Sequence, residues 1–127
     1  EGGALVRRLI MDIEADVARC LCELAGADAT LEPVAGHPEP YVTVEQVGGG
    51  GGFLEPVQLD IDCWGTEGKG GRKPAKALAE KVKAAVPSLE DELPNVFHPE
   101  VTNQYKMPDP DTRRARYVVQ VQLWVCE

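Results

Sequence analysis

Apolar residues recur at helical intervals in two segments of the chain. In residues 4–25 they are three or four positions apart, which predicts an amphipathic helix of about six turns; the stripe consists of Leu5, Leu9, Ile13, Val17, Leu21 and Leu24. Gly26 follows where a C-terminal cap belongs. Residues 74–86 form a narrower apolar face with Pro74 in the first turn, and Pro87 is expected to end this second helix of about three turns.

Alternation of apolar and polar residues predicts strands elsewhere. Residues 57–64 and 117–126 alternate with clear polarity, and the second of these segments is the strongest strand pattern in the chain. Residues 41–47 also alternate, but apolar side chains fall on both sides, so their buried face is ambiguous. We expect 41–47 and 57–64 to pair as an antiparallel hairpin, a short strand within residues 96–105, and an irregular connection over residues 27–40, which contain three prolines.

This order of elements predicts the fold class. Helix, hairpin, helix and one or two further strands are typical of an α+β two-layer sandwich, with a mostly antiparallel sheet of three to five strands and two helices packed on one face. A chain of 127 residues buries enough surface to fold as one domain without a disulfide or a metal. We therefore expect residues 1–127 to form a single domain.

Five consecutive glycines connect the two strands of the predicted hairpin, where a two-residue turn would suffice. Ordering such a run costs backbone entropy, which a contact with a partner can offset. Two interpretations stay open: a loop that only joins two strands, and a flexible hairpin tip over residues 48–56 that adapts to a neighbouring surface. The residues of the tip that would contact a partner are Gly48, Gly49, Gly50, Gly51, Gly52, Phe53 and Leu54.

Charge is unevenly distributed along the chain. The formal net charge of −8 argues against a protein that neutralises nucleic-acid phosphates with a basic face. Residues 26–68 contain eight acidic residues and no Lys or Arg, whereas residues 69–83 contain six basic residues and one acid, Glu80. These blocks are either solvated faces or complementary surfaces through which one copy of the chain contacts the next.

The sequence contains little that indicates catalysis. The segment GTEGKGGRKP lies between a predicted strand and a helix, but its spacing does not fit a phosphate-binding loop. Asp60 and Asp62 share one side of a strand and could bind Mg²⁺ in a metal-dependent hydrolase, although the polar face of a half-buried strand explains them more simply. His37 and His98 precede prolines and have no evident partner. We predict that the protein is not an enzyme and needs no cofactor.

The four cysteines are interpreted as structural. Cys20 and Cys22 are two residues apart in a helix and point in different directions, which makes them a poor pair of metal ligands. Cys63 and Cys126 lie in strand-like runs, where small buried thiols are common. A zinc site that recruits His37 or His98, and a disulfide, are the alternatives.

Membrane and export signals are not evident. No apolar run approaches the ~20 residues that a membrane span requires. The first residues lack the cleavage pattern of a secretory signal. We expect a protein that is assembled inside the cell and does not contact a membrane.

Four segments of the chain are informative together with this order of elements: PEPYVTVEQVGGG, PVQLDIDCWGT, KPAKALAEKVKAAV, and the PDPD loop that leads into RYVVQVQLWV. In these segments the sequence resembles the tail terminator proteins of long-tailed bacteriophages. The likeness is one of pattern and order over most of the chain and includes no catalytic signature. The long glycine run and the Pro-rich segment from 87 to 112 depart from the pattern.

The resemblance implies a virion protein, assembled in the host bacterial cytoplasm, that forms a hexameric ring. Such a ring caps the tail tube, stops its polymerisation and contacts a neck protein on the head side, while DNA passes through the lumen without specific binding. On this basis Lys69, Arg72 and Lys73 are expected to meet an acidic surface. The loop Asp109 to Arg114 is expected at an interface through Asp109, Asp111, Arg113 and Arg114. Another phage neck or head-completion adaptor is the alternative.

Overall fold

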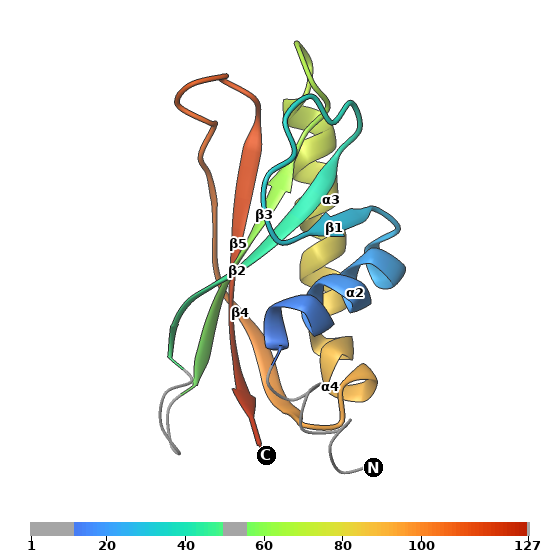
Figure 1. Ribbon diagram of the computed structural model, residues 1–127, viewed down its shortest axis with the longest axis vertical. Coiled ribbons are helices and arrows are strands. Elements are labelled where there is room, and N and C mark those ends of the chain that lie inside the picture. The colour runs from blue at the N-terminus through green and yellow to red at the C-terminus, as the bar shows by residue number, and fades with distance from the viewer. Residues whose placement is uncertain (1–11, 50–55, 127) are drawn as a thin grey trace.

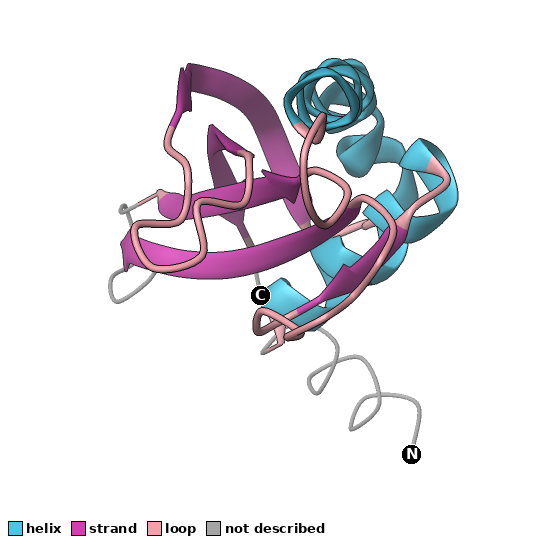
Figure 2. Ribbon diagram, turned by 90° about the horizontal axis from the view of Figure 1, so that it is seen from above, coloured by secondary structure: helices cyan, strands magenta, loops and turns pink. Residues whose placement is uncertain are grey.

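A computed structural model describes residues 12–49 and 56–126 of the protein. A twisted sheet forms one layer and the helices lie together on one of its faces (Figures 1 and 2). The elements, in chain order, are α2 (Ile13–Ala25), β1 (Asp28–Thr30), β2 (Tyr41–Gly49), β3 (Val57–Trp64), α3 (Arg72–Ala85), the 3-10 turn η1 (Val86–Ser88), α4 (Leu89–Glu92), β4 (Val96–Lys106) and β5 (Arg116–Val125).

The five strands form one mixed sheet in the order β1-β2-β3-β5-β4. β1 pairs with β2 in parallel, and the other neighbours are antiparallel. The predicted α+β class and the antiparallel hairpin are confirmed. The prediction of a wholly irregular connection over residues 27–40 is wrong, because Asp28–Thr30 pair with Tyr41–Thr43. Three residues are too few for alternation to reveal a strand.

Helix α2 ends before Gly26 as its sequence predicts, but the predicted continuous helix over residues 4–25 is wrong, because Asp12 is non-helical with φ −122° and ψ 66° and α2 begins at Ile13. The Asp12 carboxylate accepts a hydrogen bond from the N–H of Ala15, 3.3 Å away, and so caps the N-terminus. Gly26 adopts φ 70° and its N–H donates to the carbonyl of Cys22. Ile13, Val17 and Leu21 are buried, but Leu24 is exposed, so the predicted stripe extends too far at this end. Leu5 and Leu9 lie outside the described residues.

Helix α3 packs on the sheet through small residues. Ala75, Leu78, Ala79 and Val82 are buried against β3 and β5. α3 ends at Ala85, directly before the turn that contains Pro87, as predicted. Pro87 lies in the first turn of η1, where a missing N–H is tolerated, and the chain continues from η1 into the short helix α4.

Strand β2 is longer and more deeply buried than its pattern predicts. A register shift at Val47 lets pairing continue to Gly48 and Gly49, which were expected in the connection. Gly49 adopts φ 75°, and a Cβ there would collide with the carbonyl of Pro56. This glycine is required by the close approach of the two chain segments. At the other end of the strand, four successive residues beginning with Tyr41 are buried on both faces.

The two faces of the sheet differ in chemistry. Side chains that point to the helices form the core, including Val44, Leu59, Ile61 and Val121. The opposite, open face carries rows of polar side chains paired across strands: Glu45, Asp60, Gln120 and Asn103 form one row, and Gln58, Gln122 and Glu100 the next.

The two edges of the sheet are short or irregular. β1 consists of three residues. β4 shifts register against β5 twice, between Phe97 and Glu100 and between Val101 and Asn103, and His98 within it has φ 53°. Both edges therefore lack a long regular row of backbone groups.

Candidate functional site: the loop-end cleft

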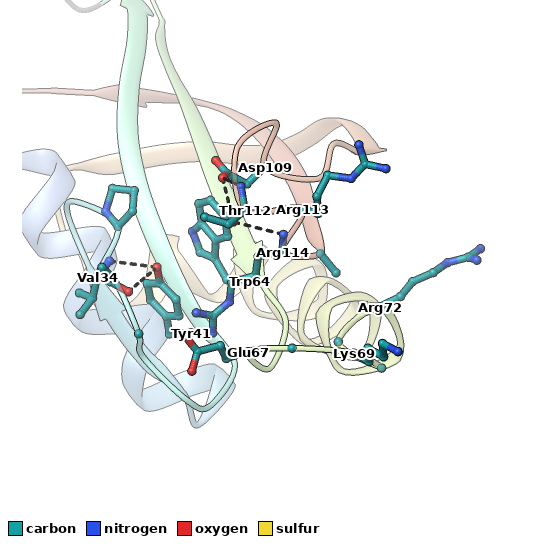
Figure 3. A pocket seen from close by; sticks show the side chains of 17 residues that line it. Val34, Tyr41, Trp64, Glu67, Lys69, Arg72, Asp109, Thr112, Arg113 and Arg114 are labelled. Carbon is teal, nitrogen blue, oxygen red and sulfur yellow. Dashed lines mark hydrogen bonds between the residues drawn. The ribbon is translucent and has the colours of Figure 1, made fainter.

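Three loops meet at one end of the sheet and enclose a cleft of about 850 Å³. They connect β1 to β2, β3 to α3, and β4 to β5, and all three lie at the upper end in Figure 1. Figure 3 shows the lining side chains. We call this feature the loop-end cleft.

The base of the cleft is a stack of aromatic rings. The rings of Tyr41 and Trp64 are nearly parallel with centroids 6.0 Å apart, and His37 stacks on Tyr41 at 4.5 Å. The indole N–H of Trp64 donates to the Thr43 hydroxyl, 3.2 Å away. The backbone N–H of Val34 donates to the Tyr41 hydroxyl at 3.0 Å. Because the polar atoms of both rings have partners, the rings can be buried at the end of the strands.

Two arginines hold the loops against these rings. Arg114 lies with its guanidinium carbon 5.2 Å from the centre of Tyr41 and donates to the carbonyls of Gly65 and Glu39. Arg116 lies 4.8 Å from the centre of Trp64 and donates to the carbonyl of Met107. Arg114 thus connects all three loops by charge-assisted hydrogen bonds and a cation–π contact.

The β4–β5 loop is ordered by its own side chains. The Asp109 carboxylate accepts hydrogen bonds from the N–H and the hydroxyl of Thr112, both 2.8 Å long. These bonds lower the pKa of Asp109 below its ordinary value. The next residue, Arg113, is left-handed with φ 65°, a conformation that favours glycine. Its side chain extends from the rim of the cleft (Figure 3).

The β3–α3 loop carries the other basic residues. Gly68 and Gly70, on either side of Lys69, both have positive φ. Lys69 and Arg72 are exposed at the rim. Arg72 also lies beside Tyr117 and lowers the pKa of that phenol. The β3–α3 and β4–β5 loops line the cleft with the cations Lys69, Arg72, Arg113 and Arg114 and the acids Glu67 and Asp109, so these sides carry an excess of positive charge.

The structure brings two of the three predicted contact regions together. Lys69, Arg72, Asp109, Arg113 and Arg114 all line the loop-end cleft. Lys73 and Asp111 are exposed neighbours that do not line it. Lys69 and Arg113 thus line one cleft although they are far apart in the sequence.

The third region lies at the other end of the sheet. Gly48 and Gly49 pair with the start of β3, whereas Trp64 ends that eight-residue strand at the cleft. At about 3.3 Å per residue, the hairpin end of the sheet is roughly 25 Å from the loop-end cleft. Gly50, Gly51, Gly52, Phe53 and Leu54 lie outside the described residues.

Asp60 and Asp62 lie on the open face of the sheet. Asp60 accepts a hydrogen bond from the Gln120 amide at 3.1 Å, and Asp62 is 3.4 Å from Arg116. Burial raises the pKa of Asp62, and the Arg116 charge opposes this shift.

In residues 12–49 and 56–126, no group of three or more His, Cys, Asp or Glu side chains is arranged as metal ligands would be. No described helix is long and apolar enough to cross a membrane.

The cysteines are all free thiols. Cys20 and Cys63 are buried, and burial raises the pKa of each thiol. Cys22 is exposed, as its helical position predicts. Cys126 was expected to be buried in a strand. This is wrong, because β5 ends at Val125 and Cys126 is exposed beyond its end.

Sequence reasoning missed the aromatic stack and the wall of the cleft beside it. Tyr41 begins one strand of the predicted hairpin and Trp64 ends the other. Their positions at the ends of two paired strands could have predicted that the two rings lie side by side. Pro33, Val34 and Ala35 form the apolar wall. They come from a segment without periodicity, so nothing in the sequence predicted their place.

The described residues thus define an α+β protein with a five-stranded mixed sheet and a cleft formed by the loops at one end of it. The model of the family described as Tail completion protein gp17 matches residues 15–126. The chain belongs to this family of bacteriophage tail completion proteins and is a structural tail protein and virion component. A comparison with curated proteins found no match.

Proposed function

We propose that the chain forms a homo-oligomeric ring, with six copies as the expected number, that caps the tail tube and ends its polymerisation. The observation that carries this proposal is the match to the tail completion family over residues 15–126. The ring joins the tail to the neck protein on the head side. In this role the chain is an assembly component and catalyses no reaction.

The open face of the sheet is suited to line the lumen of the ring. It carries Glu45, Asp60 and Glu100 among neutral amides. An acidic wall repels phosphates, so DNA would pass without binding. Arg116, which reaches this face from the loop end, is paired with Asp62.

The two ends of the domain provide different contacts. The hairpin end at Gly48 and Gly49, which leads into residues 50–54, is the proposed contact with the tube or a neighbouring subunit. The loop-end cleft, with Lys69, Arg72 and Arg113, is the proposed contact with an acidic surface, and Lys73 and Asp111 extend it. The two chemically distinct ends are suited to two different contacts in the assembly.

Electron microscopy of tails assembled with and without this protein tests the proposal. Tails with the protein should have uniform length and an additional ring at the head-proximal end. Without it, the tubes should continue to grow beyond that length. Tubes of normal length that only fail to attach to heads would contradict the capping role and indicate a neck adaptor instead. Assembly in the host cytoplasm predicts free protein in lysates before virions appear.

A further inference from the structure

We propose that the loop-end cleft of one copy receives the acidic turn Glu90–Glu92 of a second copy. The proposal rests on the ring described above and specifies the contact that builds it. Both halves of this contact are present in the same chain.

The basic half of the contact has charges available for a partner. Lys69, Arg72 and Arg113 are exposed at the rim of the cleft. Within residues 12–49 and 56–126, none of the three takes part in a salt bridge. Arg114 differs, because backbone carbonyls already occupy its guanidinium. The cleft lining also contains two carboxylates, Glu67 and Asp109, and Asp109 is already bonded to Thr112. The lining therefore keeps an excess of positive charge, of which Lys69 and Arg113 are the charges most available to carboxylates from another chain, since Arg72 also lies beside Tyr117.

The cleft also offers apolar surface beside these charges. Val34 is 42% exposed on the wall opposite Lys69, with Pro33 and Ala35 next to it. An apolar wall next to a charged rim suits an acidic segment that carries a compact apolar side chain.

The acidic half of the contact lies at the opposite end of α3. Glu90, Asp91 and Glu92 are three consecutive exposed acids in α4, and none makes a salt bridge within the described part of the chain. The exposed Pro94 follows them and supplies an apolar ring. α3 begins at the cleft and ends close to α4 (Figure 1). Each molecule is thus basic near the start of this helix and acidic beyond its end.

This arrangement makes the contact head-to-tail. A cleft on one copy and a turn on the next are different surfaces, and such heterologous contacts form a ring where the rotation between copies closes and an open filament where it does not. With a net charge of −8 the copies repel one another overall, so local pairing of opposite charges has to select the docking geometry. Because this docking depends on pairing of opposite charges, association should weaken at high salt.

Paired charge reversals test the contact. The cleft variant carries Lys69→Glu and Arg113→Glu, and the turn variant carries Glu90→Lys and Asp91→Lys. All four positions are exposed, so the variants should fold, which circular dichroism and thermal melting check. Self-association of each is measured by native mass spectrometry and sedimentation velocity. Each variant alone should associate at least roughly tenfold more weakly than the native protein.

An equimolar mixture of the two variants is the decisive sample. The native turn of the cleft variant fits the native cleft of the turn variant, and the two reversed surfaces also match each other. The mixture should therefore recover assemblies in which the two variants alternate. Two controls place the same charge changes elsewhere: Lys81→Glu with Lys106→Glu, and Glu23→Lys with Glu100→Lys. Both controls should retain native association.

Three results would overturn the inference. The first is a mixture of the two variants that stays dissociated. The second is a cleft variant or turn variant that assembles like the native protein, which would contradict this contact but not the proposed ring. A native protein that stays monomeric at its highest soluble concentration would also contradict the contact, whereas the tail-length experiment would still decide the capping role.

Discussion

Gly65, directly after β3, packs against Gly71, directly before α3, so closely that a Cβ on Gly65 would collide with the carbonyl oxygen of Gly71. This contact closes the loop that carries Lys69. The position of Lys69 at the rim of the cleft therefore depends on the absence of a side chain at Gly65.

Gly65→Ala should destabilise the protein. Because the colliding atoms belong to the backbone, the loop has to shift, at a cost of about 1–3 kcal/mol. Chemical denaturation measures the free energy of unfolding. Gly48→Ala is the matched control, because its added Cβ would meet only the Gln58 side chain at ordinary contact distance. Equal stability of the two variants would contradict the predicted collision.

Val121→Asp should prevent stable folding. Val121 is fully buried between the sheet and the helices, and an unpaired carboxylate there costs several kcal/mol. Loss of the cooperative thermal transition is the expected result. Val47→Asp makes the same change at a residue that is 51% exposed and should change stability little. A folded Val121→Asp protein would show that β5 is not a core strand.

Asp62→Asn should make stability less dependent on pH. Burial raises the pKa of Asp62, so the folded state binds its proton more tightly than the unfolded state. The ionised carboxyl therefore lowers stability at neutral pH, and this penalty disappears as the pH falls below the ordinary pKa. The amide variant should be slightly more stable than the native protein near pH 7 and equal to it in acid. A variant that is less stable near pH 7 would show that the Arg116 pair outweighs burial.

Arg113→Gly should stabilise the loop while weakening self-association. Glycine adopts the φ of 65° without the steric cost of a side chain, so the free energy of unfolding should rise by about 1 kcal/mol. Arg113→Ala removes the same charge without relieving the backbone, and so serves as the control for stability. Both variants should associate more weakly than the native protein. Native association of the glycine variant would show that the arginine is not used in the contact.

The core could be predicted because its periodicity is strong. Val57, Leu59 and Ile61 alternate with polar residues, and the structure buries all three against the helices. The two main helices were predicted because each has one apolar face. Their ends were less certain, since Leu24 is exposed beyond the buried stripe of α2.

The cleft could be predicted only in part. Lys69 and Arg113 were expected at contacts on the basis of the family resemblance, but their place on one cleft depends on the antiparallel pairing of β3 with β5. The burial of Thr43 on the open face depends on Trp64, a partner 21 residues away. Such contacts follow from tertiary packing, and local periodicity contains no information about them.

The irregular edges of the sheet limit how the protein can polymerise. A second chain that tried to add a strand beside β4 would meet two changes of register, and one that approached β1 would find three residues to pair with. Uncontrolled sheet extension of the kind that produces fibrils is thereby disfavoured. Within the described residues, the two edges of the sheet are therefore poor places for a further chain to attach, and the proposed contacts use the loop-end cleft and the acidic turn instead.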